Sequence, residues 1–181
     1  MTTVKAYFSE YGVYPLGAHV APNGEKSAAF IFGQAPGSPS IGSGVSNAEL
    51  FDILRNIDSS GAMPDGKPTR YNSKGIIFFD GKTATDERHP KSGFVPPNAK
   101  SPMHPGALVD PWGTEYFIVI SSDPLPKLLN LSYKDFQDEA APRVNIGVFS
   151  LGKDQRLGTN GDAFYKNPST SVTSDDIISW Q

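Results

Sequence analysis

The chain has 181 residues, 38% of them hydrophobic, which is enough for one domain with a full apolar core. Its 16 basic and 19 acidic residues give a net charge of −3 without any Lys/Arg cluster, so we do not expect nucleic acid as a partner. The absence of cysteine excludes disulfides, thiolate metal sites and cysteine nucleophiles. We therefore expect a single globular domain over residues 1–181, with many turns, because the chain contains 18 Gly and 16 Pro.

The first predicted element is an amphipathic helix at the N-terminus. Four apolar side chains recur at helical spacing: Val4, Tyr7, Phe8 and Tyr11. Gly12 is predicted to end this helix. The helix has no clear N-cap, so we interpret it as the end of a longer helix whose first part is absent from this sequence. No apolar run approaches the roughly 20 residues that span a bilayer, and the first residues show no signal-peptide pattern, so the chain is expected to be soluble as it stands.

Two long stretches, 17–46 and 82–105, are rich in Gly, Pro and polar residues and are predicted to be loops. The first contains one short apolar patch, 28–32, and is interpreted as an ordered loop or a flap over the core. All three histidines fall in these stretches: His19, His89 and His104. None has the paired spacing of a zinc site, and we interpret them as surface or turn residues without a catalytic role.

A second helix is predicted between the two loops. Ser46 or Asn47 can cap its start, because their short side chains accept backbone hydrogen bonds there. Its broad apolar face covers residues 50–57, and the Ser-Ser-Gly sequence at 59–61 is predicted to end it.

Three strands are predicted in the remaining chain, together with one short helix. A continuous apolar run at 75–80 indicates a buried strand, and 115–120 and 144–148 indicate two more. The short helix is expected around 128–136. Helices early, strands late and no βαβ repeat indicate an α+β domain with a small antiparallel sheet.

An oxygen-rich loop follows the last predicted strand. Asp154 comes soon after Gly152, and Gly158 allows the backbone to curl so that carbonyls and carboxylates point inward. Asp175 and Asp176 supply a second acidic pair near the C-terminus. Such a set of oxygen donors suits a hard cation, calcium above all. The spacing is not that of an EF-hand, because no Glu closes the loop.

Further donors are available around this loop. Leu151 and Arg156 can contribute backbone carbonyls, and Asn160 and Asp162 can contribute side chains. The alternative interpretation is that the acidic residues are ordinary turn and N-cap residues, which is the commonest role of Asp beside Gly and Ser.

Three motifs in the C-terminal half follow one another in a specific order: Asp-Pro-Trp-Gly at 110–113 with Tyr116 beyond it, Phe-Ser-Leu-Gly-Lys-Asp at 149–154, and Asp176-Ile177 followed by Trp180. Together they resemble the C-terminal part of the major pseudopilin of type II secretion systems, the G-type general secretion pathway protein. Residues 7–15 also resemble the end of that family's long N-terminal helix and the turn after it.

The resemblance implies a pilin-like α+β fold, with an N-terminal helix packed on a small antiparallel sheet, long loops and a C-terminal calcium-binding loop. It implies a structural subunit without enzymatic activity, anchored by its missing helix at the periplasmic face of the bacterial inner membrane. Its partners would be copies of itself in a filament, the pseudopilus, and the secretion machinery. By position, Asp154 and Asp176 match acidic calcium ligands and Leu151 and Arg156 match carbonyl donors, while Asp175 is adjacent.

The chain also departs from this family. The segment 160–174 is longer than the family's loop between the two acidic groups, and the stretches 17–46 and 82–105 exceed the usual subunit. An alternative function is therefore a minor pilin or surface adhesin that binds a partner or glycan through these loops, with exposed aromatic side chains within 17–105. A hydrolase would need converging titratable groups, and the sequence shows no such cluster.

Overall fold

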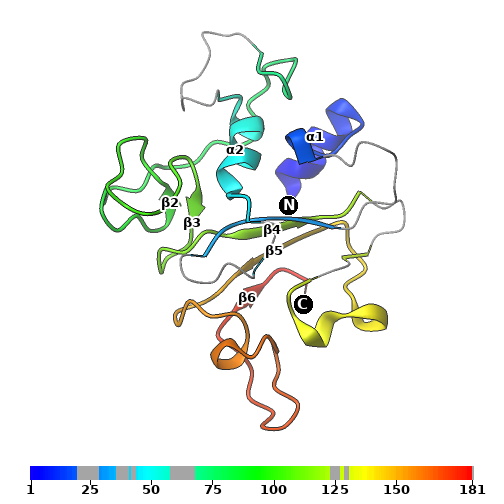
Figure 1. Cartoon of the computed structure of the whole chain (residues 1–181). Helices are drawn as coiled ribbons and strands as arrows, with labels where there is room; N and C mark the ends of the chain where they lie inside the picture. The colour runs from blue at the N-terminus through cyan, green and yellow to red at the C-terminus, as the bar shows by residue number, and fades with distance from the viewer. Residues whose placement is uncertain are drawn as a thin grey trace. The chain divides into compact units, whose positions relative to one another are not determined.

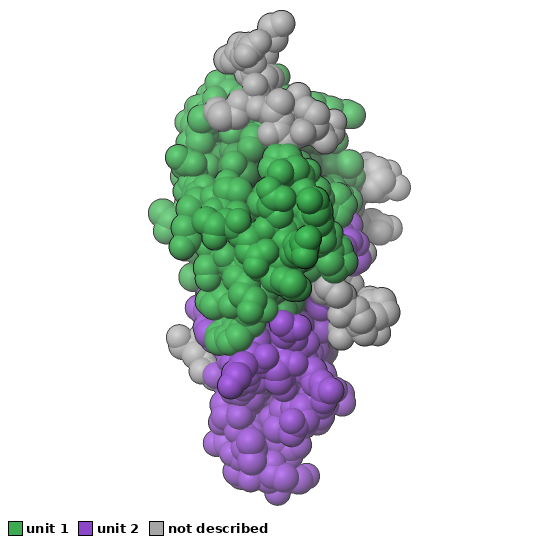
Figure 2. Space-filling view, turned by 90° about the vertical axis from the view of Figure 1, so that its left-hand side faces the viewer, with its two compact units in different colours: residues 1–20, 46–115 green, residues 21–45, 116–181 purple. Residues whose placement is uncertain are grey.

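The computed structural model of the chain describes residues 1–19, 29–35, 41, 44–57, 68–122, 127–128 and 131–180. The chain forms two compact units, coloured separately in Figure 2. Unit 1 comprises residues 1–20 and 46–115, and unit 2 comprises 21–45 and 116–181. Each unit is therefore assembled from two separate segments, and one domain over the whole chain stays a prediction.

In unit 1, helix α1 (Thr2–Tyr11) confirms the first predicted helix and its end. Gly12 has a φ of 69°, a left-handed conformation that glycine adopts without strain, and its N–H donates to the Phe8 carbonyl. Val4 and Tyr7 are buried, whereas the Phe8 side chain is 40% exposed, so only part of the predicted apolar stripe lies in a core. Neither helix in the described residues is long and apolar enough to cross a membrane.

Helix α2 (Asn47–Arg55) begins at the predicted cap, where Ser46 Oγ accepts a hydrogen bond from the Ala48 N–H at 3.2 Å. The predicted end at 59–61 is wrong, because the helix has already ended at Arg55. Residues 59–61 themselves lie outside the described part of the chain. The helix ends after Arg55 because Asn56 adopts a left-handed conformation, with φ 53°, and its N–H bonds back to the last turn.

The start of α2 is fixed by Glu115, which is 1% exposed. Its Oε1 accepts a hydrogen bond from Ser46 Oγ and its Oε2 accepts one from the Asn47 N–H, both at 2.8 Å. A carboxylate at a helix N-terminus is stabilised by the helix dipole as well as by these bonds. Glu115 therefore joins two segments 68 residues apart.

The Asp-Pro-Trp-Gly motif forms a tight turn around the buried Asp110. Its Oδ1 accepts hydrogen bonds from the N–H groups of Trp112, Gly113 and Thr114 at 2.8–2.9 Å. The turn follows a two-stranded sheet in which β2 (Gly93–Phe94) pairs antiparallel with β3 (Leu108–Val109). Strand β2 lies within 82–105, where the sequence predicts only a loop, because a strand of two residues leaves no periodic signal.

The predicted strand at 75–80 is wrong. The segment has no regular secondary structure and joins no sheet, and Ile77 is 50% exposed. Its backbone donors bond elsewhere, since the N–H groups of Phe78 and Phe79 both donate to the Leu54 carbonyl near the end of α2. The apolar run packs along a helix end instead of pairing with a strand.

Unit 2 contains a four-stranded sheet in the order β1-β4-β5-β6, with every neighbouring pair antiparallel (Figure 1). The strands are β1 (Phe30–Phe32), β4 (Phe117–Ile120), β5 (Ile146–Ser150) and β6 (Ile177–Ile178). This confirms the mixed helix and antiparallel-sheet class and two of the predicted strands, within two residues at their starts. Strand β1 contradicts the loop predicted at 17–46.

The core of unit 2 is aromatic. Phe117 and Phe149 stack with ring centroids 4.8 Å apart, and Tyr133 meets Phe149 edge-on at 5.4 Å. Tyr133 does not lie in the helix predicted around 128–136, because the described residues of that range form only the short 3₁₀ turn η2 (Lys134–Phe136), which a second such turn, η3 (Asp138–Ala140), follows.

Trp180 anchors the C-terminal segment on this core. Its ring centroid lies 6.2 Å from that of Tyr133 and 6.0 Å from that of Phe149. Strand β5 accommodates it through Gly147, where a Cβ would come within 2.9 Å of the Trp180 ring. Trp180 therefore fixes the end of the chain on the core of unit 2.

Candidate metal centre

The loop after β5 lies directly against the C-terminal segment. Gly152 has a φ of 66°, and a Cβ at this position would lie 2.4 Å from the Asp175 carbonyl oxygen. Only glycine tolerates both the left-handed backbone and this approach. The close contact brings the two acidic segments, 22 residues apart, into one site.

The structure brings together three of the predicted ligand residues. One carboxylate oxygen from each of Asp154, Asp175 and Asp176 lies within 4.8 Å of the other two. Within the described ranges, no Lys, Arg or His nitrogen lies within 4.0 Å of these carboxylates. The site therefore concentrates negative charge without a protein counter-charge.

Two of the three carboxylates are exposed and also make turn hydrogen bonds. Asp154 Oδ1 accepts the N–H of Arg156 at 2.9 Å. Asp175 Oδ2 accepts the N–H groups of Lys153 at 2.6 Å and of Asp154 at 3.2 Å. These bonds are what the alternative interpretation as turn residues requires, so Asp154 and Asp175 do not discriminate between the two interpretations.

Asp176 differs from its neighbours because its side chain is buried, with 4% exposed. Its Oδ2 accepts hydrogen bonds from the Tyr133 hydroxyl and the Gly158 N–H, both at 2.7 Å. Its Oδ1 is buried and has no hydrogen-bond partner among the residues that the structure describes. A turn or cap role does not explain an unpartnered buried carboxylate oxygen, which normally costs free energy.

Burial raises the pKa of Asp176 from 3.8 to about 6, while the bonds from Tyr133 and Gly158 and the nearby Ser174 hydroxyl oppose the rise and the charge of Asp175 adds to it. The pKa of the Tyr133 hydroxyl is also raised, mainly by burial and then by the charge of Asp176. The ionised form of Asp176 is therefore the costly one in the protein alone, and a cation beside it would stabilise that form.

The other predicted donors are placed less decisively. The side chain of Leu151 is fully buried in the apolar core of unit 2, and Arg156 is exposed in the loop. That their backbone carbonyls bind the cation remains a prediction. Asp162 is not part of the acidic group, because its oxygens accept hydrogen bonds from the Phe164 N–H at 2.9 Å and the Asn167 amide at 2.7 Å.

Tyr133 is the participant that the sequence analysis missed. It lies 43 residues before Asp176, in a segment predicted to be helical, and no local pattern points to its contact with the site. The Gly158 N–H was also not predicted as a donor, although the glycine itself was. The segment 160–174 folds back on itself, with a bridge between Lys166 and Thr173, so its length does not separate the acidic groups.

This arrangement can bind a hard cation. Carboxylate oxygens are preferred ligands of calcium and magnesium, and calcium tolerates the irregular geometry of a loop better than magnesium does. Compared with known proteins, the chain matches no family model, no curated protein and no solved structure. The likeness to pseudopilins therefore remains a resemblance of motifs.

Proposed function

We propose that this chain is a structural, pseudopilin-like subunit of a bacterial type II secretion system, and that one calcium ion bound by Asp154, Asp175 and Asp176 stabilises it. The observation that carries the proposal is the buried Asp176 Oδ1, which has no partner in the described residues and belongs to a group of three carboxylates without a counter-cation. A bound cation supplies both the missing partner and the missing charge.

The order of the elements supports the pilin-like part of the proposal. A short helix comes first, an antiparallel sheet follows, and the acidic loop comes directly after β5. Trp180 then holds the C-terminal segment against Tyr133. The subunit acts through assembly, so its partners are other subunits and the secretion machinery, at the periplasmic side of the inner membrane.

Calcium would act by joining the loop after β5 to the C-terminal segment. Each segment contributes at least one carboxylate, Asp154 from the first and Asp175 and Asp176 from the second. Without the cation, repulsion between these charges favours separation of the two segments. The stability of the tail, and of any subunit contact that uses it, would then follow the calcium concentration.

The adhesin alternative predicts exposed aromatic side chains within 17–105. In the described part of that range, the aromatic side chains are all buried or half-buried. The described residues therefore do not favour that alternative.

The first test is the melting temperature of the chain in chelator and across a calcium titration, with magnesium as the control cation. A saturable rise is expected, worth about 2.7 kcal/mol when calcium is at 100 times its dissociation constant. The absence of any calcium-dependent rise would refute the metal site.

Two variants separate a ligand from a turn residue. Asp154→Ala is expected to remove most of the calcium-dependent rise and to change stability little in chelator, because Asp154 is exposed and its carboxylate accepts only the Arg156 N–H among the described residues. Asp162→Ala is the matched control, since it removes a turn carboxylate outside the acidic group and is expected to keep the full rise. An equal loss for Asp154→Ala with and without calcium would identify it as a turn residue.

The assembly part is tested separately by reading the coding sequence directly upstream of Thr2. A pseudopilin gene is expected to encode there an apolar helix of about 20 residues after a short basic leader. An upstream sequence without such a segment would contradict the pseudopilin assignment and leave the calcium site unaffected.

A further inference from the structure

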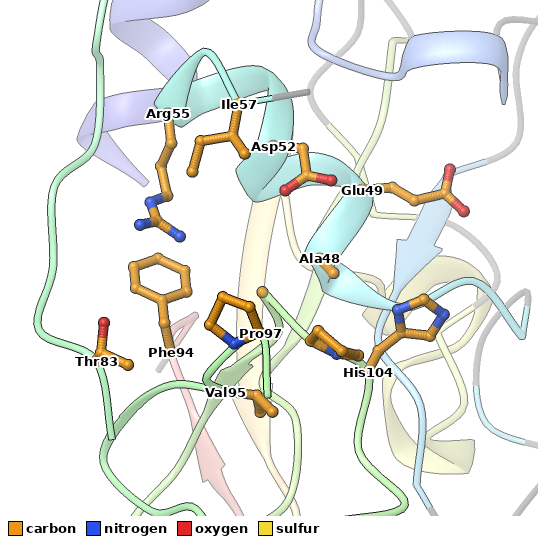
Figure 3. A pocket seen from close by; sticks show the side chains of 12 residues that line it. Ala48, Glu49, Asp52, Arg55, Ile57, Thr83, Phe94, Val95, Pro97 and His104 are labelled. Atoms are coloured by element: carbon orange, nitrogen blue, oxygen red, sulfur yellow. The ribbon is translucent and has the colours of Figure 1, made fainter. Parts of the chain in front are cut away.

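Unit 1 contains a cavity of about 360 Å³ next to α2. One wall is the face of α2 that carries Glu49, Asp52 and Arg55, and the opposite wall is formed by residues 94–97 and 104–106 (Figure 3). This volume is at the lower end of the range typical of small-molecule sites. All of its lining residues belong to unit 1.

Arg55 is held at one end of this cavity in a fixed orientation. Its guanidinium carbon lies 4.0 Å from the centre of the Phe94 ring, and Figure 3 shows the group standing above that ring. Phe94 is 1% exposed and is itself held edge-on by Phe51 and Phe79, at centroid distances of 5.3 and 5.8 Å. The flat face of the guanidinium is thus stacked on a ring that is itself fixed. The N–H groups at the edge of the guanidinium then determine which ligands it can bind.

No residue that the structure describes accepts a hydrogen bond from the N–H groups of Arg55. Nor does any of the described residues form an ion pair with the guanidinium within 4.0 Å. Burial lowers the pKa of Arg55, and the charges of Asp52 and Asp80 oppose this change. A half-buried, stacked guanidinium whose donors are not used by any described residue is a preorganised receptor for a carboxylate, which it binds with two parallel hydrogen bonds.

The rest of the charged lining is acidic. Asp52 lies one helical turn before Arg55, and its carboxylate points from α2 into the cavity (Figure 3). Glu49 lies a further turn away and pairs with His19, whose Nε2 is 2.9 Å from Glu49 Oε2. Asp80 adds a further negative charge near Arg55. A purely anionic ligand would be repelled by these carboxylates, and a purely cationic ligand would be repelled by Arg55.

We infer that this cavity binds a small zwitterion of the amino-acid or dipeptide type, with its carboxylate on the Arg55 guanidinium and its ammonium group on Asp52. The apolar residues Val95 and Pro97, which also line the cavity, would contact an aliphatic ligand side chain. The proposal is independent of the calcium site, which lies in unit 2.

The test is a titration of the isotope-labelled chain with alanyl-leucine and with leucine, followed by backbone amide chemical shifts. Saturable shifts are expected at residues 48–57, 94–97 and 104–106 for at least one of these zwitterions. Two capped forms of the same molecules, the C-terminal amide and the N-acetyl derivative, are expected to bind at least about tenfold more weakly, since each loses one charge-assisted contact. These comparisons use the unmodified protein, so no folding defect can explain them.

Variants assign the two ends of the ligand. Arg55→Lys keeps the charge but removes the planar pair of donors, and is expected to weaken the zwitterion about tenfold or more and to make the remaining affinity less sensitive to C-terminal amidation. Asp52→Asn is expected to remove the sensitivity to N-acetylation. Arg70→Lys is the matched control, because Arg70 also lies over an aromatic ring, that of Tyr71 at 5.3 Å, but does not line the cavity.

Two results would overturn the inference. The first is the absence of saturable shifts at the cavity residues for both zwitterions at millimolar concentrations. The second is equal affinity for the zwitterions and their capped forms, which would mean that neither charged end is recognised.

Discussion

Replacing Asp176 by Asn is expected to stabilise the chain in chelator at neutral pH, although it removes a proposed calcium ligand. Burial raises the pKa of this carboxyl from 3.8 to about 6. The difference corresponds to about 3 kcal/mol of cost for keeping the buried group ionised. Asn is neutral and nearly the same shape, and its carbonyl oxygen can accept the bonds from Tyr133 and Gly158. The expected gain is up to about 3 kcal/mol, or roughly 6–12 °C in melting temperature for a chain of this length.

The pH dependence of this difference follows from linkage. A carboxyl whose pKa is raised in the folded state contributes stability that is fully present below its unfolded value, 3.8, and is lost as the pH rises through about 6. In chelator, the advantage of Asp176→Asn over the unmodified chain should therefore be near zero at about pH 4 and largest at about pH 7. The comparison between the two proteins cancels other titrating groups, such as Asp86 and Asp162, whose pKa values are lowered.

Urea unfolding at several pH values, with chelator and with saturating calcium, measures both effects. Calcium at about 1,000 times its dissociation constant should reverse the ranking at neutral pH, because it stabilises the unmodified chain by about 4.1 kcal/mol and not the variant. Asp154→Asn serves as the control, since that carboxylate is exposed and should give no comparable gain in chelator. If Asp176→Asn destabilises the chain in chelator equally at low and neutral pH, the carboxylate is needed for its hydrogen bonds and the argument from burial is refuted.

Three further substitutions test the parts of the fold on which the sites depend. Glu115→Ala removes two buried hydrogen bonds to a carboxylate and should cost about 3 kcal/mol in urea unfolding, and a cost near zero would contradict the capping role. Asp110→Ala leaves three turn N–H groups without their acceptor and should lower the free energy of unfolding by roughly 2–4 kcal/mol in the same assay. A neutral result would mean that water replaces the carboxylate. Gly152→Ala should cost clearly more than Gly12→Ala, because both glycines have similar φ values, 66° and 69°, but only a Cβ at Gly152 meets another atom, the Asp175 carbonyl oxygen at 2.4 Å. Equal thermal shifts for the two variants would show that the loop adjusts freely.

Elements set by local interactions could be predicted from the sequence. The end of α1 at Gly12 and the start of α2 at Ser46 depend on backbone conformation and capping within a few residues. The apolar run at 75–80 was misread because its donors bond the carbonyl of Leu54, a partner more than 20 residues away. Strand β1 was missed for the same kind of reason, since three residues acquire strand structure only by pairing with β4.

The candidate metal site shows the same division. Asp154, Asp175 and Asp176 could be named from the order of the motifs, which fixes residue types and spacing. Their proximity depends on Gly152 and on the folding of segment 160–174, and local patterns do not encode such a closure. Tyr133 could not be predicted at all, because its contact with Asp176 exists only once the core of unit 2 has formed.

The C-terminal segment is held more by its side chains than by its strand. Strand β6 pairs with only two residues of β5, Phe149 and Ser150, so the ladder alone gives it little stability. Its remaining attachments are the burial of Trp180 on the aromatic core and the bonds of Asp176 to Tyr133 and Gly158. Because Asp176 directly precedes β6, a cation that neutralises it would act on the strand that covers the edge of β5. The proposed calcium site is therefore placed where a single ion can decide whether this sheet ends in a paired strand or in an open edge.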